Sequence, residues 1–542
     1  MTNSIAELRD ADTILVIGSN TTECHPVIGI LLRQAAVAGT KIVVADPRKI
    51  DLTRHAVLHL QHRPGTDAAL IDGLIREILA QGLEDREFIA GRTERFDDLK
   101  TSIEPYTPEK VEEITGVPAA DLRTAARIYG EAGAASICYA MGITQHVAGT
   151  DNVKALANLA MVTGNVGKPS TGVNPLRGQN NVQGACDLGG LPNVYPGYQK
   201  VTDKALRKKF EKAWGRALSP TVGLTVTEAI AKAHTGELKA LYVLGEDPAL
   251  SDPNSTHVRE ALEKLELLVV QEIFPTESSN YAHVILPGVS FAEKDGTVTN
   301  TERRVRRTRK AVEPPGEARE DTRILLDLAA RLGLPMDYAG PADIFDEIAS
   351  LTPSYGGMSY ARLEGEGLQW PCPTPDHPGT PYLHKDVFAS GKGLFHAIPY
   401  APPPERPDDE YPYTLSTGRM LYHFHTGNMT RRSAGLDAHV PEGAVEIHPR
   451  DAETLGLAQG DWVKVSSRRG TVRVKAEVSE KPSPGMVFMT FHFKEAAANL
   501  LTIDAFDPVA KIPEFKVCAV RLEKMAPPTE EDAADNRALS SA

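Results

Sequence analysis

The chain has 542 residues, which at roughly 150 residues per domain corresponds to three or four domains. Its 41% hydrophobic and 24% charged residues are ordinary for a globular protein and exclude whole-chain disorder, a collagen helix and a coiled coil. The formal net charge of -13 disfavours non-specific attraction to nucleic acid or to an anionic membrane.

Targeting signals and cysteine usage point to a reducing compartment. No stretch approaches the roughly 18 to 20 apolar residues that span a bilayer, and the first ten residues lack the basic start and apolar centre of a signal peptide. Cys24, Cys138, Cys186, Cys372 and Cys518 form no CxxC pair, so their spacing indicates neither an iron-sulfur cluster nor a zinc site nor a disulfide framework. We expect a cytoplasmic chain.

Two segments have a βαβ pattern. Residues 13–18 (TILVIG) lead into a helix from Pro26 and a second run at 42–46 (IVVAD). Residues 240–245 (ALYVLG) lead into a helical stretch at 258–265 and a run at 267–271 (LLVVQ). Each half has a glycine at one strand end and an acid after the next strand. The pattern predicts two similar nucleotide half-sites, for one two-headed ligand or for two ligands.

Between these units the composition predicts helices at 121–132 and 152–161, with Asp151 as N-cap of the second. Residues 164–193 are rich in Gly, Asn, Gln and Pro and carry little apolar surface, so polar contacts must hold them or they stay loose. A long polar loop of this kind is usually functional.

The C-terminal part has a different composition. Residues 398–412 (IPYAPPPERPDDEYP) predict a stiff linker. Short strand-like runs at 444–447, 462–466, 471–478 and 486–490 then predict a small β-barrel, and the chain from 526 onward predicts a disordered tail.

The expected fold class is therefore α/β, with two Rossmann-like α/β domains followed by a C-terminal β-barrel. We expect the first α/β domain over 1–175, the second over 176–400, a linker over 401–412, the barrel over 413–525 and the tail over 526–542.

Two short motifs are candidates for anion binding. Gly18-Ser19-Asn20 lies where a strand meets a helix, and free backbone N–H groups there favour a phosphate. An ordinary strand-to-helix turn uses the same residues. Asp46 and Arg48 at the next strand end suit a ribose or base and a phosphate, and an exposed turn is the alternative.

Arg177 is the strongest single candidate for substrate binding. It is the only cation between Lys168 and Lys200, and it lies in the polar frame NPLRGQNN. A guanidinium can hold a small carboxylate through two parallel hydrogen bonds.

Two other clusters favour structural interpretations. The run at 303–310 (RRVRRTRK) favours a solvated strand face over a nucleic-acid site because acidic residues flank it. His423 and His425 form an HxH pair without further nearby ligands, so we predict no metal site and interpret them as structural or cofactor contacts.

Several motifs together resemble the molybdopterin oxidoreductases, specifically the catalytic (alpha) subunit of formate dehydrogenase. They are GSNTTECHP (18–26), ADPRK (45–49), RPGTD (63–67), MGITQH (141–146), NPLRGQNNVQGACDLG (174–189), GEDP (245–248), EKDGTVTNTERRVR (293–306), TGRMLYHFHTGNMTRRS (417–433), and the region from FHFKEAAANLLT to PEFKVCAVRLEK (491–524). Each motif alone is weak, but their order and number are highly specific.

The resemblance implies a bis-molybdopterin guanine dinucleotide (bis-MGD) carrying Mo or W, with one guanine dinucleotide on each α/β half and the barrel closing over both pterins. The residues implied for one nucleotide are Gly18, Ser19, Asn20, Asp46 and Arg48, and those for the other are Gly245, Glu246, Asp247, Gln271 and Glu272. Pterin or pyrophosphate contacts are implied for Gly142, Gln145, Gln179, Arg419, His425, Thr426, Asn499 and Lys516. Arg177 matches the family's arginine that orients formate for oxidation to CO2.

One departure from the family pattern concerns the start of the chain. Family members carry an N-terminal iron-sulfur region and a Cys or selenocysteine metal ligand followed by a histidine base, and this chain has none of these motifs. We hypothesise that Met1 is an internal methionine downstream of a selenocysteine codon. Iron-sulfur clusters are then expected only on the missing part or on a partner chain, with NAD(P)H- or flavin-linked redox subunits as further partners.

Three alternatives stay open. The chain is a related bis-MGD enzyme such as a nitrate reductase, a non-catalytic scaffold or electron-transfer subunit, or a separately made subunit that completes its site with a partner.

Overall fold

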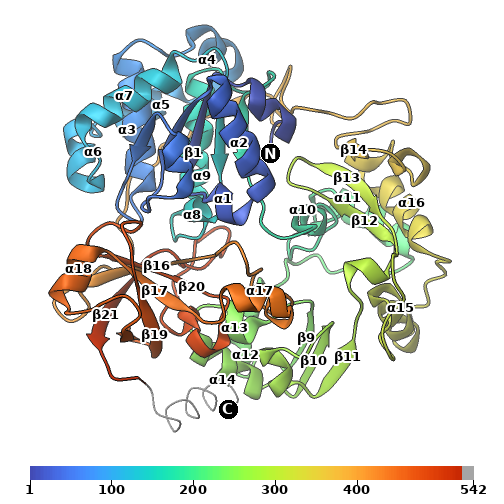
Figure 1. Ribbon diagram of the computed structural model, residues 1–542. Coiled ribbons are helices and arrows are strands. Elements are labelled where there is room, and N and C mark those ends of the chain that lie inside the picture. The colour runs from blue at the N-terminus through green and yellow to red at the C-terminus, as the bar shows by residue number, and fades with distance from the viewer. Residues whose placement is uncertain (528–542) are drawn as a thin grey trace. The chain divides into compact units, whose positions relative to one another are not determined.

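The structure is a computed structural model that describes residues 1–527, so the predicted tail lies almost entirely outside the described residues. Contacts divide the chain into two compact units (Figure 1). Unit 1 contains Met1–Leu176, Asp247–Arg259 and the described chain from Tyr382 onward, and unit 2 contains Arg177–Glu246 and Glu260–Pro381.

Unit 1 contains a five-stranded parallel sheet of order β3-β2-β1-β5-β6. Its strands are β1 (Thr13–Ile17), β2 (Lys41–Ala45), β3 (Leu58–Leu60), β5 (Ala135–Tyr139) and β6 (Gly172–Pro175). The helices around it are α1 (Thr21–Cys24), α2 (Pro26–Ala38), α3 (Asp67–Ala80), α4 (Arg86–Arg92), α5 (Phe96–Ile103), α6 (Pro108–Thr115), α7 (Ala119–Gly130), α8 (Met141–Thr144) and α9 (Gly149–Val162).

Apolar side chains cover both faces of this sheet. Leu15 and Ile17 of β1 pack into a core that α3, α7 and α9 share, whereas Ile14 and Val16 pack into a second core with α2. Successive side chains of a strand point to opposite faces, which is why a parallel strand covered on both sides reads as a continuous apolar run. The polar residues that follow these strands are thereby brought to one edge of the sheet.

The C-terminal part of unit 1 is a closed six-stranded barrel of order β16-β20-β17-β19-β18-β21. The strands are β16 (Tyr413–Gly418), β17 (Ala444–Ile447), β18 (Trp462–Ser466), β19 (Thr471–Val478), β20 (Met486–Thr490) and β21 (Cys518–Lys524), with α17 (Ala434–His439) and α18 (Pro449–Thr454) between them. The four predicted runs are strands, and the sequence analysis missed the two that close the barrel, β16 and β21.

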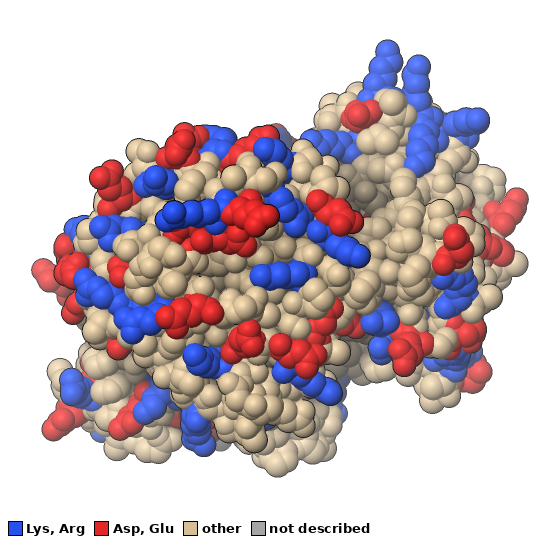
Figure 2. Space-filling model, turned by 90° about the horizontal axis from the view of Figure 1, so that it is seen from above, with Lys and Arg blue, Asp and Glu red and all other residues tan. Residues whose placement is uncertain are grey.

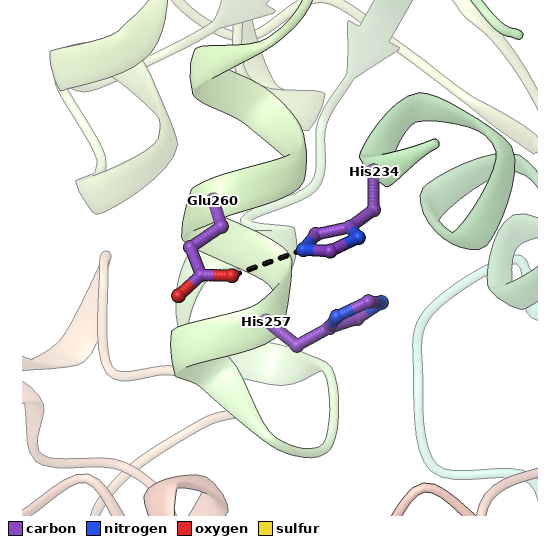
Figure 3. Close-up of side chains that lie close together, drawn as sticks. All are labelled: His234, His257 and Glu260. Atoms are coloured by element: carbon purple, nitrogen blue, oxygen red, sulfur yellow. Dashed lines mark hydrogen bonds and ion pairs between the residues drawn. The ribbon is translucent and has the colours of Figure 1, made fainter. Parts of the chain in front are cut away.

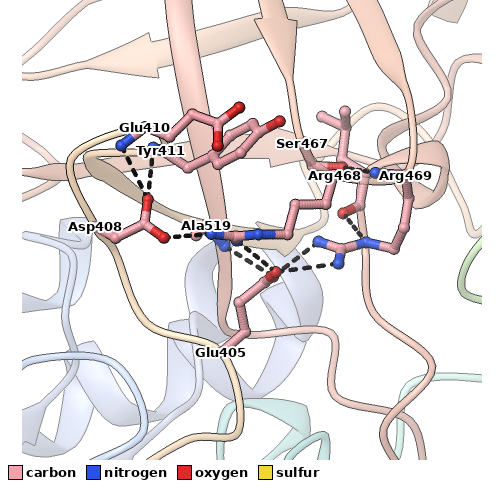
Figure 4. A network of polar contacts seen from close by, with 9 residues as sticks. Glu405, Asp408, Glu410, Tyr411, Ser467, Arg468, Arg469 and Ala519 are labelled. Carbon is pink, nitrogen blue, oxygen red and sulfur yellow. Dashed lines mark hydrogen bonds and ion pairs between the residues drawn. The ribbon is translucent and has the colours of Figure 1, made fainter.

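The proline-rich linker is fastened to the barrel (Figure 4). Glu405 accepts hydrogen bonds from Arg468, from Arg469 at 2.7 Å and from the backbone N–H of Ala519 at 3.0 Å. Burial alone would raise the pKa of Glu405, but these donors lower it. Asp408 pairs with Arg468 as well. The linker is therefore held by charge-assisted contacts at its centre.

Unit 2 is built around a three-stranded parallel sheet of order β11-β10-β9 and a three-stranded antiparallel sheet of order β12-β13-β14. The strands are β9 (Ala240–Leu244), β10 (Leu267–Glu272), β11 (Val284–Pro287), β12 (Gly296–Thr299), β13 (Arg304–Thr308) and β14 (Leu368–Gln369). The helices include α10 (Val182–Asp187), α11 (Lys204–Trp214), α12 (Val226–His234), α15 (Asp321–Arg331) and α16 (Pro341–Leu351). Of the two short helices that follow β9 in the chain, α13 (Pro248–Ser251) belongs to unit 1, and α14 (Ser255–Glu263) has residues in both units.

The structure confirms the predicted βαβ strands and helices and corrects two details. Asp151 lies inside the first turn of α9, whose N-cap is Ala148, so the predicted cap was wrong. The polar segment 164–193 contains β6 and α10. Asn174 within it donates to Ser136 Oγ at 2.8 Å, which agrees with the expectation of polar support.

The basic run at 303–310 differs from the predicted solvated strand face. Arg303 is 2% exposed and donates to the carbonyls of Thr380 and Pro381, and Arg307 and Arg309 pair with Glu364. Several of the run's guanidinium groups are therefore bound by carbonyl and carboxylate oxygens within unit 2. Acidic and basic side chains are interspersed over most of the face in Figure 2.

Among the described residues, no helix combines the length and apolarity needed to cross a membrane.

Candidate functional site

The ends of β1 and β5 meet through two glycines. The N–H of Gly142 donates to the carbonyl of Gly18 at 3.0 Å. A Cβ on Gly142 would lie 2.5 Å from that carbonyl oxygen, and Gly18 has a positive φ of 55°. Only glycine fits both positions. Two residues that the family resemblance implied are thus in backbone contact.

Polar side chains beside this contact are buried without internal partners. In the described part of the chain, Ser19 Oγ, Asn20 Oδ1, Thr21 Oγ1 and Thr22 Oγ1 make no hydrogen bond. Burying a polar atom unpaired costs roughly 1–3 kcal/mol. Four such atoms in consecutive residues at one strand end indicate a surface built to contact a polar ligand.

The predicted pair after β2 is only partly available to a ligand. Asp46 is 9% exposed and accepts from the backbone N–H of Arg48 at 2.9 Å, and burial raises its pKa. The Arg48 guanidinium contacts both carboxylate oxygens of Glu446, the shorter at 2.6 Å, and lies 3.6 Å from the ring centre of Phe488. Arg48 therefore joins the sheet to the barrel, and its charge is already compensated.

The barrel contributes cations to the same region. Lys516 donates from Nζ to the carbonyl of Thr417 at 2.6 Å. Burial, with help from the nearby Arg419, lowers the pKa of Lys516 to about 8. Burial also lowers the pKa of Arg419, and burial together with Arg419 lowers the pKa of His425 to about 4. Two partly buried cations and a neutral imidazole suit an anionic ligand, because a bound anion offsets the cost of desolvating the cations.

A cavity of about 380 Å³ lies between the two parts of unit 1. Thr22 and Glu23 line it from the sheet side, and Arg419 and Phe488 line it from the barrel side. Burial raises the pKa of Glu23 despite the nearby charge of Arg48. The sheet edge and the barrel thus line one open cavity that carries both charged and apolar side chains.

Three further predicted contacts lie in unit 1. Asn499 donates from Nδ2 to the carbonyls of Leu250 and Ser251, while its Oδ1 is buried without a partner in the described chain. Thr426 and Asp247 are buried, and Asn428 donates to Asp247 at 3.4 Å.

A buried chain of imidazoles and carboxylates supports Gln145 and its neighbours. His62 Nε2 lies 3.0 Å from Asp67, Asp67 lies 3.7 Å from His146 Nε2, and His146 Nδ1 lies 2.9 Å from Glu514. All four side chains are at most 5% exposed. Burial alone would lower the pKa of His146, but Glu514 and Asp67 raise it to about 9.

This series of buried side chains supports the loop that carries the predicted pterin contact Gln145. Glu514 also accepts from the N–H of Val147 at 2.9 Å, and the carbonyl of Gln145 accepts from Phe515. The sequence analysis did not predict this series of contacts, although His146, Asp67 and Glu514 each lie in one of the motifs that carry the family resemblance.

In unit 2, the ends of β9 and β10 lie side by side. The N–H of Gly245 donates to the carbonyl of Gln271 at 3.0 Å. Gln271 accepts from the hydroxyl of Tyr242 and donates to Asp321 at 2.7 Å. Glu246 is exposed, and Glu272 accepts from its neighbour Ile273 at 2.7 Å.

Arg177 and Gln179 also belong to unit 2. The N–H of Arg177 donates to Thr301 Oγ1 at 3.1 Å, and its guanidinium lies 3.5 Å from the sulfur of Cys186. Gln179 accepts a backbone hydrogen bond from Val182 at 3.4 Å. The arginine is therefore held at its backbone and at its side chain.

Other histidines serve structural contacts. His423 contacts the carbonyl of Val440 at 2.8 Å and Thr430 at 3.2 Å, in agreement with its structural interpretation. His234 of α12 pairs with Glu260 of α14 at 3.0 Å, and His257 lies one turn before Glu260 on that helix (Figure 3).

Comparison with known proteins identifies the family. Residues 1–331 match the family Molybdopterin oxidoreductase, and residues 413–519 match the Molydopterin dinucleotide binding domain. The chain belongs to the molybdopterin oxidoreductases.

The relatives of this molybdopterin oxidoreductase include formate dehydrogenases. The alpha subunit of F420-dependent formate dehydrogenase 1 from Methanococcus maripaludis and the corresponding subunit from Methanocaldococcus jannaschii are each 50% identical over 97% of this chain and 78% of their own length. Formate dehydrogenase H from Escherichia coli is 42% identical over 97% of this chain and 74% of its own length. The resemblance read from the motifs is confirmed.

The fold has a counterpart among solved structures. Acetylene hydratase from Pelobacter acetylenicus superposes with a TM-score of 0.74 at 20% identity, over 96% of this chain and 81% of the hydratase. This likeness concerns the fold alone.

The residues present fit the family's bis-MGD with Mo or W. The polar atoms after β1 that have no partner among the described residues, and the partly buried cations Arg419 and Lys516, match a ligand that carries pyrophosphate and many hydrogen-bonding groups.

Proposed function

We propose that this molybdopterin oxidoreductase oxidises formate to CO2. The reaction removes one proton and two electrons from formate, and the electrons pass to an iron-sulfur region or chain and on to a redox subunit. The observation that carries the proposal is the 50% identity, over 97% of this chain, to proteins named as formate dehydrogenase alpha subunits.

In this proposal the two units hold different parts of the reaction. A bound bis-MGD supplies the metal centre that accepts the two electrons. Gly18, Ser19 and Asn20 bind one dinucleotide, Gly245 and Gln271 contribute to the other, and Arg419 and Lys516 neutralise phosphate or pterin charge. These two parallel sheets are the cores of two Rossmann-like domains, although residues 247–259 and the chain from 382 onward group with unit 1 and not with the second domain expected over 176–400.

Arg177 orients the substrate. Its guanidinium offers two parallel N–H donors to the two oxygens of formate, which leaves the C–H bond free to face the reaction centre. The 3.5 Å contact of its guanidinium with Cys186 Sγ helps to set the direction of this planar group.

The test replaces Arg177 in the holoenzyme purified with its partners. Arg177→Ala should reduce kcat/KM for formate at least about 100-fold, because it removes a charged hydrogen-bonding pair. Arg177→Lys keeps the charge but loses the two-point geometry, and it should fall between Ala and wild type. Lys208→Ala, at an exposed position of α11, is the matched control. Normal formate turnover in Arg177→Ala would contradict the role proposed for Arg177, whereas a metal-loaded wild-type holoenzyme that consumes no formate would contradict the proposed function.

A second candidate is a cofactor-binding subunit without its own turnover. The extensive charged contacts between sheet and barrel, such as Arg48 with Glu446, suit a scaffold as well as an enzyme. Metal-loaded holoenzyme that exchanges electrons with its partners but never consumes formate would favour this alternative.

A further inference from the structure

Asp187 is a buried carboxylate with four side-chain donors. Its Oδ1 accepts from Gln183 at 2.7 Å and from the Tyr198 hydroxyl at 2.7 Å. Its Oδ2 accepts from the Tyr355 hydroxyl at 2.8 Å and from the Trp370 indole at 2.6 Å. Asp187 is 1% exposed. Two good hydrogen bonds on each oxygen offset the cost of burying the group.

The stability of its own helix does not explain this carboxylate. Asp187 is the last residue of α10, where a negative charge opposes the helix dipole. Three of its four partners lie outside this helix, namely Tyr198, Tyr355 of the 3-10 turn at Pro353–Tyr355, and Trp370 after β14. The carboxylate therefore joins four parts of unit 2 at the end of the helix that follows Arg177.

A continuous series of contacts leads from Asp187 to the Arg177 loop. The Tyr355 hydroxyl also contacts Thr299 Oγ1 at 3.3 Å, and the N–H of Thr299 donates to Asn181 Oδ1 at 2.9 Å. Thr301, two residues further along the same hairpin, accepts from the N–H of Arg177. The loop is thus fastened at both ends to a hairpin that the Asp187 network holds.

A second connection is shorter. Cys186 immediately precedes Asp187, and its sulfur accepts from the Arg177 guanidinium. The charge of Arg177 also acts on Tyr198, which donates to Asp187: it works to lower the pKa of the Tyr198 hydroxyl. A displacement of the end of α10 therefore moves the atoms beside the guanidinium.

We infer that Asp187 is a positioning residue for substrate binding: through Tyr355 and Thr299 on one side and Cys186 on the other, it fixes the Arg177 guanidinium in the orientation that receives formate. The inference rests on the proposed function, because it assigns Arg177 to the substrate carboxylate. Preorganisation of this kind lowers KM, since the guanidinium binds formate equally in the ground state and the transition state.

The experiment compares Asp187→Asn with Tyr195→Phe in the holoenzyme. An amide at 187 turns one acceptor into a donor that faces two other donors, so the network must open. Tyr195 is also buried in unit 2 and stacks on Phe210, but its hydroxyl has no partner within the described chain. Its variant therefore controls for the loss of a buried polar group outside the network.

Asp187→Asn should raise KM for formate about 10- to 100-fold, with kcat within a few-fold of wild type and metal content unchanged. Amide hydrogen exchange of residues 177–186 should become faster in Asp187→Asn and stay at the wild-type rate in Tyr195→Phe. Tyr355→Phe, which removes one link and leaves the carboxylate, should show a smaller change in the same direction.

Two results would overturn the inference. Unchanged KM and unchanged exchange in Asp187→Asn would show that the network does not govern Arg177. A kcat that falls in proportion to metal content, at normal KM, would assign Asp187 to folding alone. Normal formate turnover in Arg177→Lys and Arg177→Ala would instead remove the proposed role of Arg177, so the two failures are distinguishable.

Discussion

The two parallel-sheet edges that look alike in the sequence differ in how their polar groups are satisfied. At the edge of unit 1, four consecutive polar side chains after β1 are buried without partners among residues 1–527. At the edge of unit 2, Gln271 is already bonded to Tyr242 and Asp321. A ligand bound at the first edge would add hydrogen bonds, whereas a ligand bound at the second edge would have to replace hydrogen bonds that are already made.

The strands beneath these edges differ as well. All five residues of β1 are buried, whereas β9 and β11 are largely half-buried or exposed. Related half-sites in one chain therefore need not be equally preorganised. We expect the edge of unit 1 to carry more of the affinity for a dinucleotide, because less free energy is lost in rearranging it.

The largest expected effect on stability comes from replacing the glycines that follow the first strand at each edge, Gly18 and Gly245. Gly18 and Gly245 have similar positive φ values of 55° and 65°, so alanine costs about 1–2 kcal/mol of backbone strain at either. A Cβ on Gly18 would also meet Gly142 and Ile143 at 2.8 and 2.9 Å, which adds about 1–3 kcal/mol of overpacking. In the described part of the chain, no other atom lies within 4 Å of a Cβ on Gly245.

Chemical denaturation of Gly18→Ala and Gly245→Ala measures the difference. Gly18→Ala should lower the free energy of unfolding more, and it should also lower the cofactor content. Equal losses in the two variants would mean that the close contact at the edge of unit 1 carries no special cost.

The second prediction concerns pH and the His146 pair. Because the folded pKa of His146 is about 9, above the ordinary value of 6.5, its stabilising contribution is fully present below about pH 6.5 and is lost as pH rises through 9. This contribution is on the order of 3 kcal/mol. His146→Gln should flatten the fall of stability between pH 6.5 and 9.5, as measured by denaturant midpoints. A wild-type slope retained in the variant would assign the titration to another group.

The smallest effect distinguishes the hydrogen bonds at the two edges. Tyr242→Phe should destabilise unit 2 by about 1 kcal/mol, because it removes a made hydrogen bond. Ser19→Ala should leave the cofactor-free protein as stable as wild type or more so, because Ser19 Oγ has no partner in the described chain. Cofactor retention after dilution should nevertheless fall in Ser19→Ala, and unchanged retention would argue against a ligand contact there.

Local patterns predicted much of this architecture. Buried parallel strands require continuous apolar runs, and β1 and β2 follow from that rule. The strands of the second βαβ unit and four of the six barrel strands follow from short strand-like runs bounded by Gly, Pro and polar residues. Arg177 stood out because it is an isolated cation in a polar frame. Its backbone support by Thr301 matches that expectation of a held loop.

Pairings between distant residues could not be predicted. Arg48 pairs with Glu446, and His146 with Glu514, and the partners in each pair lie far apart in the sequence and meet only in the folded structure. From its basic neighbours, Arg303 was predicted to be a solvated cation. It is buried instead, and its guanidinium donates to the carbonyls of Thr380 and Pro381, which lie far away in the sequence. Local sequence carries no signal for such a partner.

The most direct test is the ratio of guanine nucleotide to metal released when the purified holoenzyme is denatured. If both sheet edges hold a dinucleotide, the ratio should be two guanine nucleotides per Mo or W atom, and Ser19→Ala should lower both contents together. One guanine nucleotide per metal atom, or metal without any nucleotide, would contradict the account of two half-sites.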